Sequence, residues 1–145
     1  MFSQNLLPML NGADRTTGLI DSLKRRVIRA IQVHLWGMDI APSARIAPSA
    51  LIDRTWPRGV HIGAGCIIDE EAVILTHDMT RGLYLDTYLG EGCHLGARAI
   101  IMPGLKVGHD SIVAPGAVVV RDVPPRSYAV GNPAKVQPRD SVSIA

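Results

Sequence analysis

Aromatic residues are scarce in this chain, at 4% of the sequence, although hydrophobic residues make up 47%. The core must therefore be mainly aliphatic. Two cysteines are too few for a disulfide framework. No apolar run is long enough to span a bilayer, and the start MFSQNLLPMLNG lacks the basic and apolar segments of a secretion signal. We therefore expect a cytoplasmic protein.

A strong excess of charge is also absent. The formal net charge is +2, which is too small to indicate a nucleic-acid partner. The 145 residues suffice for one domain. The chain is instead rich in glycine, with 14 residues, and in proline, with 10, and both indicate many turns.

Most of the chain repeats every six residues, in three blocks that begin at Ile40, Ile62 and Leu89. The first position of every hexad is Ile, Leu or Val, and the fifth is usually small. A short fixed period of large and small apolar positions is typical of a stacked β-helix. The pattern therefore predicts an all-β solenoid. The hexads read IAPSAR, IAPSAL, IDRTWP; IGAGCI, IDEEAV, ILTHDM; and LGEGCH, LGARAI, IMPGLK, VGHDSI, VAPGAV, VVRDVP.

Stacking gives these repeats their stability. One short strand cannot bury its large side chain alone, whereas stacked coils align these side chains in columns, each worth roughly 1.5–3 kcal/mol when fully buried. Three hexads close one coil. Cys66 and Cys93 both occupy fifth positions. We expect them to be small corner hydrophobes rather than catalytic thiols, because these positions face inward.

A helical pattern precedes the repeats, between Thr16 and Gly37. Its apolar residues recur every four positions and form a set that we call the apolar stripe: Leu19, Leu23, Val27, Ile31 and Leu35. We expect residues 1–38 to be an irregular arm and a helix that caps the stack, and residues 39–145 to be the repeat domain with its tail. The opposite face carries Lys24, Arg25, Arg26 and Arg29. A solvated face is the favoured interpretation of these charges, and a peripheral contact with anionic lipid is the less favoured one.

The repeat is interrupted once at length, in the segment ILTHDMTRGLYLDTY from Ile74 to Tyr88. Asp78 falls at a fifth position, where a carboxylate pointing into the core would be costly. We therefore expect the chain to leave the coil here, with His77 where the loop begins and residues 79–88 in a projecting loop. Local rules are most often broken at functional sites, so His77 is a candidate catalytic residue.

Three ordered strings complete the pattern: THD, then GCHLGARAIIMPGLKVG, then VAPGAVVVRDVPPRSYAVGNPAKV. With them the chain resembles the hexapeptide-repeat acyltransferases between Asp39 and Val136, and in particular the maltose, galactoside, xenobiotic and polysaccharide O-acetyltransferases. The resemblance implies a left-handed parallel β-helix of hexapeptide repeats, with the N-terminal amphipathic helix and one projecting loop. It also implies a homotrimer with its sites between subunits, acetyl-CoA as co-substrate, and no metal.

The resemblance assigns residues to the site. It implies that His77 is the catalytic base, while Asp78 either orients a histidine or caps the loop. His94 stands where many members carry a tryptophan, so its role is open between the thioester and the surface. The coenzyme candidates are Ala97 and Pro115, for close main-chain approach, and Arg121 and Lys135, for phosphates. The acceptor candidates are Asp53, Trp56 and Asp69, chosen by position alone, and Trp56 would either stack on a sugar or seal the TWPRG bulge.

We therefore predict an acetyl-CoA-dependent O-acetyltransferase that acts on a hydroxyl of a sugar or polysaccharide precursor. One alternative is a non-catalytic β-helix scaffold. A second is a zinc carbonic anhydrase of the same fold, which needs three converging histidines. The closest histidines, His94 and His109, lie 15 residues apart, which fits that enzyme poorly.

Overall fold

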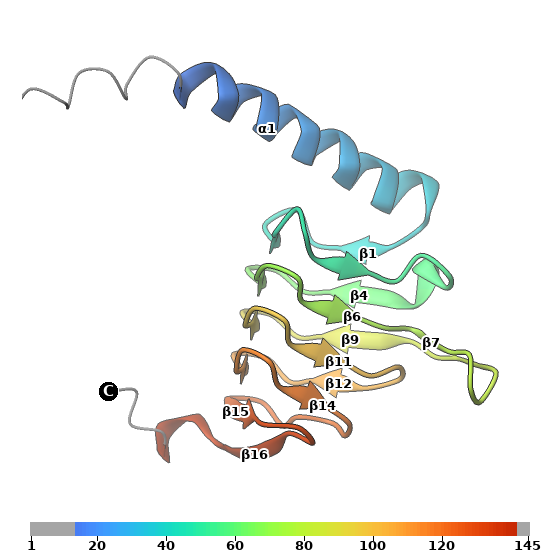
Figure 1. The fold of residues 1–145 in the computed structure, drawn as a ribbon, viewed down its shortest axis with the longest axis vertical. Coiled ribbons are helices and arrows are strands. Elements are labelled where there is room, and N and C mark those ends of the chain that lie inside the picture. The colour runs from blue at the N-terminus through green and yellow to red at the C-terminus, as the bar shows by residue number, and fades with distance from the viewer. Residues whose placement is uncertain (1–13, 142–145) are drawn as a thin grey trace, which may run out of the picture.

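The computed structural model describes residues 14–141, which form one N-terminal helix followed by a stack of parallel strands (Figure 1). Residues 1–13 of the expected arm and residues 142–145 lie outside the described part. The helix, α1, spans Asp14–Ala30 and continues as a π-helical turn, η1, over Ile31–Leu35. It therefore begins two residues before the predicted start at Thr16.

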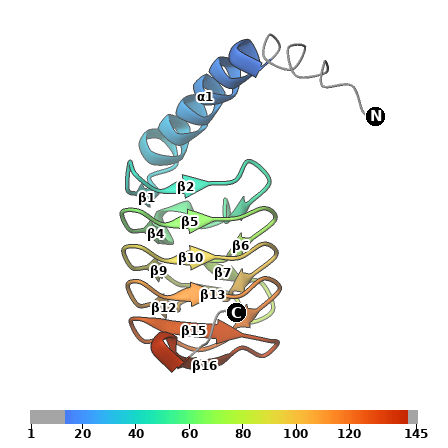
Figure 2. The ribbon, with the colours of Figure 1, turned by 90° about the vertical axis from the view of Figure 1, so that its left-hand side faces the viewer.

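Short strands form three sheets, in the orders β1-β4-β9-β12, β2-β5-β10-β13-β15-β16 and β3-β6-β11-β14. The chain visits the three sheets in rotation, so it winds as stacked three-sided coils (Figure 2). All pairings are parallel except β15–β16 and the separate pair β7–β8. The strands are β1 Asp39–Ile40, β2 Arg45–Ile46, β3 Leu51–Ile52, β4 Val60–Ile62, β5 Ile67–Ile68, β6 Val73–Ile74, β7 His77–Asp78, β8 Leu83–Tyr84, β9 Thr87–Leu89, β10 His94–Leu95, β11 Ile100–Ile101, β12 Lys106–Val107, β13 Ile112–Val113, β14 Val118–Val119, β15 Ser127–Val130 and β16 Lys135–Pro138; two 3₁₀ turns are η2 Pro57–Gly59 and η3 Arg139–Ser141.

The large residues that open the hexads form the core, as the repeat predicts. In the third sheet Ile52 pairs with Ile74, Ile74 with Ile101, and Ile101 with Val119. All four are buried. The exception among the twelve first positions is Ile46 in the first coil, which is half-buried and packs against the core from its edge.

The small positions explain how closely the coils stack. Cys66 and Cys93 are buried free thiols, and they donate hydrogen bonds to the carbonyls of Gly90 and Gly108, at 3.0 and 3.1 Å. Both cysteines therefore lie at inward corners, as expected. A Cβ atom at Gly108 would lie 2.3 Å from the backbone nitrogen of Pro125 in the next coil. The second hexad position there is glycine because neighbouring backbones leave no room for a side chain.

Helix α1 joins the first coil through a different face from the apolar stripe. The Arg29 guanidinium donates hydrogen bonds to the carbonyls of Ala41 and Ala44, both at 3.0 Å, while Val33 and Trp36 pack against the core. The apolar stripe is exposed along its whole length, and the capping role of the helix stays a prediction. Among the described residues, no helix has both the length and the apolar character needed to cross a membrane.

Candidate functional site

The chain leaves the stack after β6, at the position that the repeat indicates. His77 and Asp78 form β7, which pairs antiparallel with β8 in a hairpin. This hairpin projects sideways from the coils (right of Figure 1), and the chain rejoins the stack at Thr87. His77 therefore lies where a rigid coil meets a projecting loop.

A buried carboxylate holds the imidazole of His77. Ile52 pairs with Ile74, so Asp53 lies one coil away from the start of the hairpin. Its Oδ2 pairs with Nδ1 of His77 and also accepts hydrogen bonds from the backbone N–H groups of Thr76 and His77, at 2.8 and 3.1 Å. Oδ1 accepts the N–H of Thr55 at 2.8 Å. The Asp53 side chain is 2% exposed and that of His77 is 21% exposed, so Nδ1 is held inside and Nε2 is the nitrogen left to react.

Burial alone would raise the pKa of Asp53. Hydrogen bonds from Thr76, His77 and Thr55 to the ionised carboxylate outweigh that effect and lower its pKa to about 2. Asp53 is therefore ionised wherever the protein works near neutral pH. A carboxylate fixed on Nδ1 keeps the proton on that nitrogen and leaves Nε2 as a base.

The lowered pKa of Asp53 predicts a loss of stability in acid. The unfolded chain takes up this proton near its usual pKa of about 4, whereas the folded protein takes it up only near 2. The stabilisation is therefore complete above about pH 5 and is lost as the pH falls toward 2, by an amount on the order of 2 kcal/mol. Unfolding free energies of the wild type and of Asp53→Asn should converge over that interval. A gap that stays constant with pH would contradict the assignment.

Asp78 serves the loop and not the histidine. Its Oδ1 accepts hydrogen bonds from the N–H and the hydroxyl of Thr80, at 2.9 and 2.6 Å, and its Oδ2 accepts from Nε of Arg81 at 2.6 Å. Hydrogen bonds from Thr80 and Arg81 hold the pKa of Asp78 well below its usual range. Of the two roles open for Asp78, the structure shows the local one: it caps the turn that leads the chain out of the coil.

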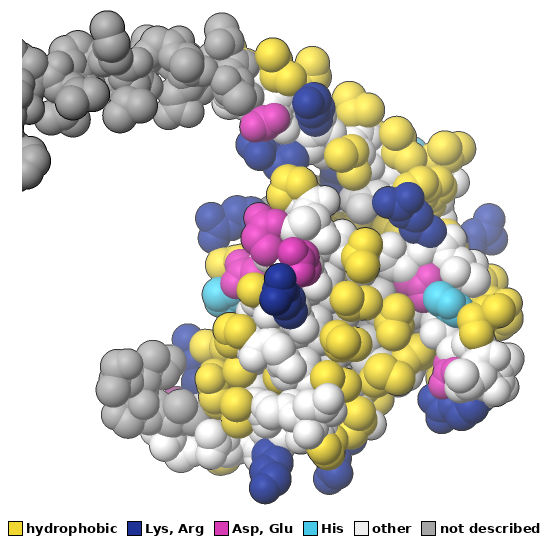
Figure 3. Space-filling view, in the orientation of Figure 1, with side chains coloured by type: hydrophobic (Ala, Val, Ile, Leu, Met, Phe, Trp, Pro, Cys, Tyr) yellow, Lys and Arg dark blue, Asp and Glu magenta, His cyan; other side chains and the backbone are white. Residues whose placement is uncertain are grey.

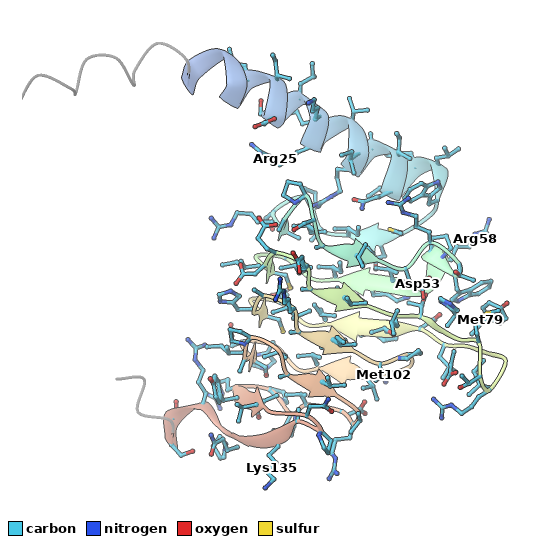
Figure 4. All side chains as sticks on the ribbon, in the orientation of Figure 1. Arg25, Asp53, Arg58, Met79, Met102 and Lys135 are labelled. Carbon is cyan, nitrogen blue, oxygen red and sulfur yellow. The ribbon has the colours of Figure 1, made fainter. Side chains whose placement is uncertain are left out.

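Aromatic side chains lie beside the hairpin. The carbonyl of Trp56 accepts the hydroxyl of Thr76 at 2.8 Å, next to His77. The Trp56 ring meets the Tyr84 ring edge-on at 5.8 Å, and its Nε1 donates to Asp86 at 3.4 Å. Asp53 lies on the side of the stack from which the hairpin projects, and Met79 lies in the hairpin itself (Figure 4). Trp56 therefore contributes both to the bulge and to the surroundings of His77.

Asp69 is placed differently from Trp56. It follows β5 and precedes β6, whereas His77 follows β6, so the two lie at opposite ends of that strand. Asp69 pairs with Nε2 of His94 at 2.8 Å. These side chains are 41% and 40% exposed. Solvent therefore screens the Asp69–His94 interaction more strongly than the buried Asp53–His77 interaction.

The four coenzyme candidates fall into two groups. Ala97 and Pro115 follow β10 and β13 and lie in adjacent coils, joined by the hydrogen bond from the N–H of Gly116 to the Ala97 carbonyl at 2.9 Å. Arg121 and Lys135 both line a pocket of about 610 Å³ at the last coil, together with residues 130–134 and Val136. The structure brings together the two cations, which the sequence separates by fourteen positions.

Asp53 is the site residue whose role the sequence did not reveal. It was a candidate for the acceptor by position alone, whereas it holds the imidazole of His77. Coil register was the available signal, because Ile52 and Ile74 both open hexads and the residues after them must be neighbours. Within residues 14–141, no three His, Cys, Asp or Glu side chains gather in a way that would hold a metal ion.

The molecule is thus a stack of hexapeptide coils, and a buried His–Asp pair lies where a hairpin projects from it. Residues 86–121 match the profile of the bacterial transferase hexapeptide (six repeats) family. The chain is 36% identical over 108 residues to serine acetyltransferase 4 of Arabidopsis thaliana, covering 71% of this chain and 30% of that protein. The chain is therefore similar to hexapeptide-repeat transferases over residues 86–121, and over a longer stretch to proteins named acetyltransferases. It spans about a third of the length of the first curated relatives it matches.

Two solved structures share the fold. A hexapeptide-repeat acetyltransferase from Vibrio cholerae superposes with a TM-score of 0.59 at 20% identity, over 75% of this chain and 77% of that one. Galactoside acetyltransferase in complex with coenzyme A gives a TM-score of 0.53 at 19% identity, over 71% of this chain and 67% of that one. At these sequence identities the comparison shows only that the folds are similar.

Proposed function

We propose that the protein is an acetyl-CoA-dependent O-acetyltransferase with His77 as its general base. The observation that carries the proposal is the buried Asp53–His77 pair at the start of the hairpin. The carboxylate occupies Nδ1 and so leaves Nε2 as the nitrogen that can accept a proton. The sequence similarity gives further support, since the relative at 36% identity is named a serine acetyltransferase.

The reaction needs few protein groups. Nε2 of His77 takes the proton of the acceptor hydroxyl while its oxygen attacks the thioester carbonyl. The tetrahedral intermediate collapses with cleavage of the carbon–sulfur bond, and the departing thiolate of CoA receives the proton from His77. Asp53 keeps the imidazole oriented and stabilises its charged form between the two steps. A thioester is already activated, so the transfer needs no covalent enzyme intermediate.

Arg121 and Lys135 are the proposed ligands of the CoA phosphates, and Ala97 and Pro115 the positions of close main-chain contact. Support comes from the shared pocket of the two cations. Arg121 follows β14, two coils from β6 along the edge where His77 lies, which is about 10 Å at the usual spacing of strands. The phosphates and the reacting thioester would then lie at different heights along one edge of the stack.

This assignment predicts a loss of coenzyme affinity in a double charge reversal. Arg121→Glu combined with Lys135→Glu should weaken CoA binding by roughly 10- to 100-fold, because two charge-assisted hydrogen bonds are lost. Titration calorimetry with CoA would measure it. Pantetheine, which lacks the nucleotide phosphates, should bind both proteins alike. Arg45→Glu, at an exposed arginine of the first coil, is the matched control and should leave CoA binding unchanged. Unaltered CoA binding in the double variant would contradict the assignment.

The resemblance further implies left-handed coils and a homotrimer with sites between subunits, and we include both in the proposal. The outer face of the third sheet supports the assembly. Leu51, Val73, Ile100 and Val118 stand in register there, and Leu51 is 60% exposed. Apolar side chains cover this face of the molecule, between the hairpin and the opposite edge (Figure 3). A second copy on that face would cover an apolar surface and come close to His77 at the end of β6.

A hydroxyl of a sugar or polysaccharide precursor is the proposed acceptor, with Trp56 beside His77 as the surface for a sugar ring. Serine is the second candidate, because the curated relatives at 33–36% identity are named serine acetyltransferases. Asp69 would serve the acceptor only from a neighbouring subunit, since it lies at the far end of β6 in its own chain.

The test is an acceptor screen in which the free thiol of released CoA is measured. The full chain is incubated with acetyl-CoA and, separately, with maltose, a galactoside and serine. We expect release of CoA above the rate without acceptor for at least one hydroxyl compound. No acceptor-dependent release from a panel that covers sugars and amino acids would favour the scaffold alternative, and stoichiometric zinc with carbon dioxide hydration would favour the carbonic anhydrase.

A further inference from the structure

We propose that the apolar stripe of α1 binds the surface of an anionic bilayer. The inference is independent of the acetyltransferase proposal, because it concerns the opposite end of the molecule from the coenzyme pocket. Leu19 and Leu35, at the two ends of the stripe, are 69% and 75% exposed. Leu23 and Val27 between them are 62% and 50% exposed, and Ile20 and Ile28 beside them are more than half exposed. A helix of this length leaving so many large aliphatic side chains uncovered needs a partner.

The coil stack of the same chain cannot be that partner. Arg29, Val33 and Trp36 form the face that docks on the first coil, and they follow one another at helical spacing. Burial lowers the pKa of Arg29, whose guanidinium is committed to two carbonyls of the first coil. The stripe lies on the other side of the helix, where its side chains cover the upper surface (Figure 3). The helix is therefore fixed with its apolar face turned away from the protein.

Two basic side chains accompany the apolar stripe. At 3.6 residues per turn, Arg26 falls at its edge beside Leu19, and Lys24 falls within the apolar face, between Ile20 and Ile28. Both are exposed. Long basic side chains at these positions can extend to lipid phosphates while the aliphatic side chains enter the acyl boundary. Arg25 falls on the far side and points down from the helix (Figure 4).

The same charges argue against a second copy as the partner. In a bundle of identical helices that pack through the stripe, the Lys24 ammonium would be taken out of water among aliphatic side chains, which is costly. Asp21 is the one acidic residue between positions 18 and 35, and it lies off the stripe. An anionic lipid surface is instead complementary to Lys24 and Arg26, at about 1 kcal/mol for each basic residue near the surface.

Co-sedimentation of the full chain with lipid vesicles tests the proposal. Vesicles of phosphatidylcholine with about a third phosphatidylglycerol should bind the protein about tenfold more tightly than pure phosphatidylcholine, and salt should reduce the difference. Lys24→Glu combined with Arg26→Glu should remove the preference for anionic lipid. Arg25→Glu is the matched control and should change binding by less than about threefold.

The contribution of the apolar stripe to vesicle binding is tested separately from that of the basic residues. Leu23→Ser combined with Val27→Ser should lower binding to anionic vesicles by about tenfold, with the unfolding transition of the coil stack unchanged, because both residues are exposed. Equal binding to neutral and anionic vesicles would overturn the proposal. So would an effect of Arg25→Glu as large as that of Lys24→Glu and Arg26→Glu. A serine pair that halves the particle mass in light scattering and leaves vesicle binding intact would show a second copy on the stripe and would also overturn it.

Discussion

His77→Ala is expected to lower acetyl transfer by roughly 10²- to 10⁴-fold, the usual contribution of a general base. The reason is the arrangement at Nδ1, where the buried Asp53 carboxylate holds the ring with Nε2 as the free base. Asp53→Asn should lower the rate as well, because an amide in that position can stabilise the wrong tautomer. Initial rates with acetyl-CoA and the best acceptor of the screen would measure both variants.

The control for His77→Ala is a second histidine that also has an aspartate partner. His109 pairs with Asp110 at 3.0 Å, but both side chains are 55% exposed and lie on the turn after β12. His109→Ala should therefore leave the rate within about twofold, since an exposed pair contributes little. CoA affinity should be retained in the His77 variant. A rate that survives His77→Ala would refute the catalytic role of this residue.

Leu95→Ala is expected to lower the free energy of unfolding by about 2–5 kcal/mol. Leu95 opens a hexad in β10, is fully buried, and lies between Ile68 and Val113 of the neighbouring coils. The stack cannot close the cavity, because the backbone hydrogen bonds of three coils fix their spacing. Chemical denaturation followed by circular dichroism would measure the change.

The same substitution at Leu19 is the control for Leu95→Ala. Leu19 is 69% exposed on α1, so its truncation removes little buried surface. We expect Leu19→Ala to change the free energy of unfolding by less than about 0.5 kcal/mol. Equal losses at Leu95 and Leu19 would mean that the stack is not the cooperative unit of this protein.

The hexad pattern was sufficient to predict the core and the exit of the chain. Large residues at first positions became buried columns, because a period of six places the same position on the same side of every coil. Asp78 marked the exit correctly for a simple reason: a carboxylate has no partner inside an aliphatic corner. The resemblance supplied the acetyltransferase assignment of His77, which the repeat alone would not have given.

Only the register of the coils could indicate the pairing of Asp53 with His77 from sequence, because twenty-four positions separate the two residues. The TWPRG bulge between them hides the register, since it shifts the phase of the repeat before the next block begins. Asp69 and Asp53 follow Ile68 and Ile52 in the same way along the chain, yet one carboxylate is half exposed and the other is buried. The difference arises because Thr55, Thr76 and His77 all bond to Asp53 and enclose it.

By itself, the sequence determined the stacked coils, their aliphatic core, the amphipathic helix and the point where the chain departs, because each of these follows from local periodicity. The tertiary structure decided which aspartate holds His77, how Arg121 and Lys135 come to share a pocket, and which way the apolar stripe faces. These outcomes depend on contacts between distant residues and on the one face of α1 that docks through Arg29. The periodicity of the sequence determines which residues share one face of a helix or strand, whereas tertiary packing determines which other residues contact that face.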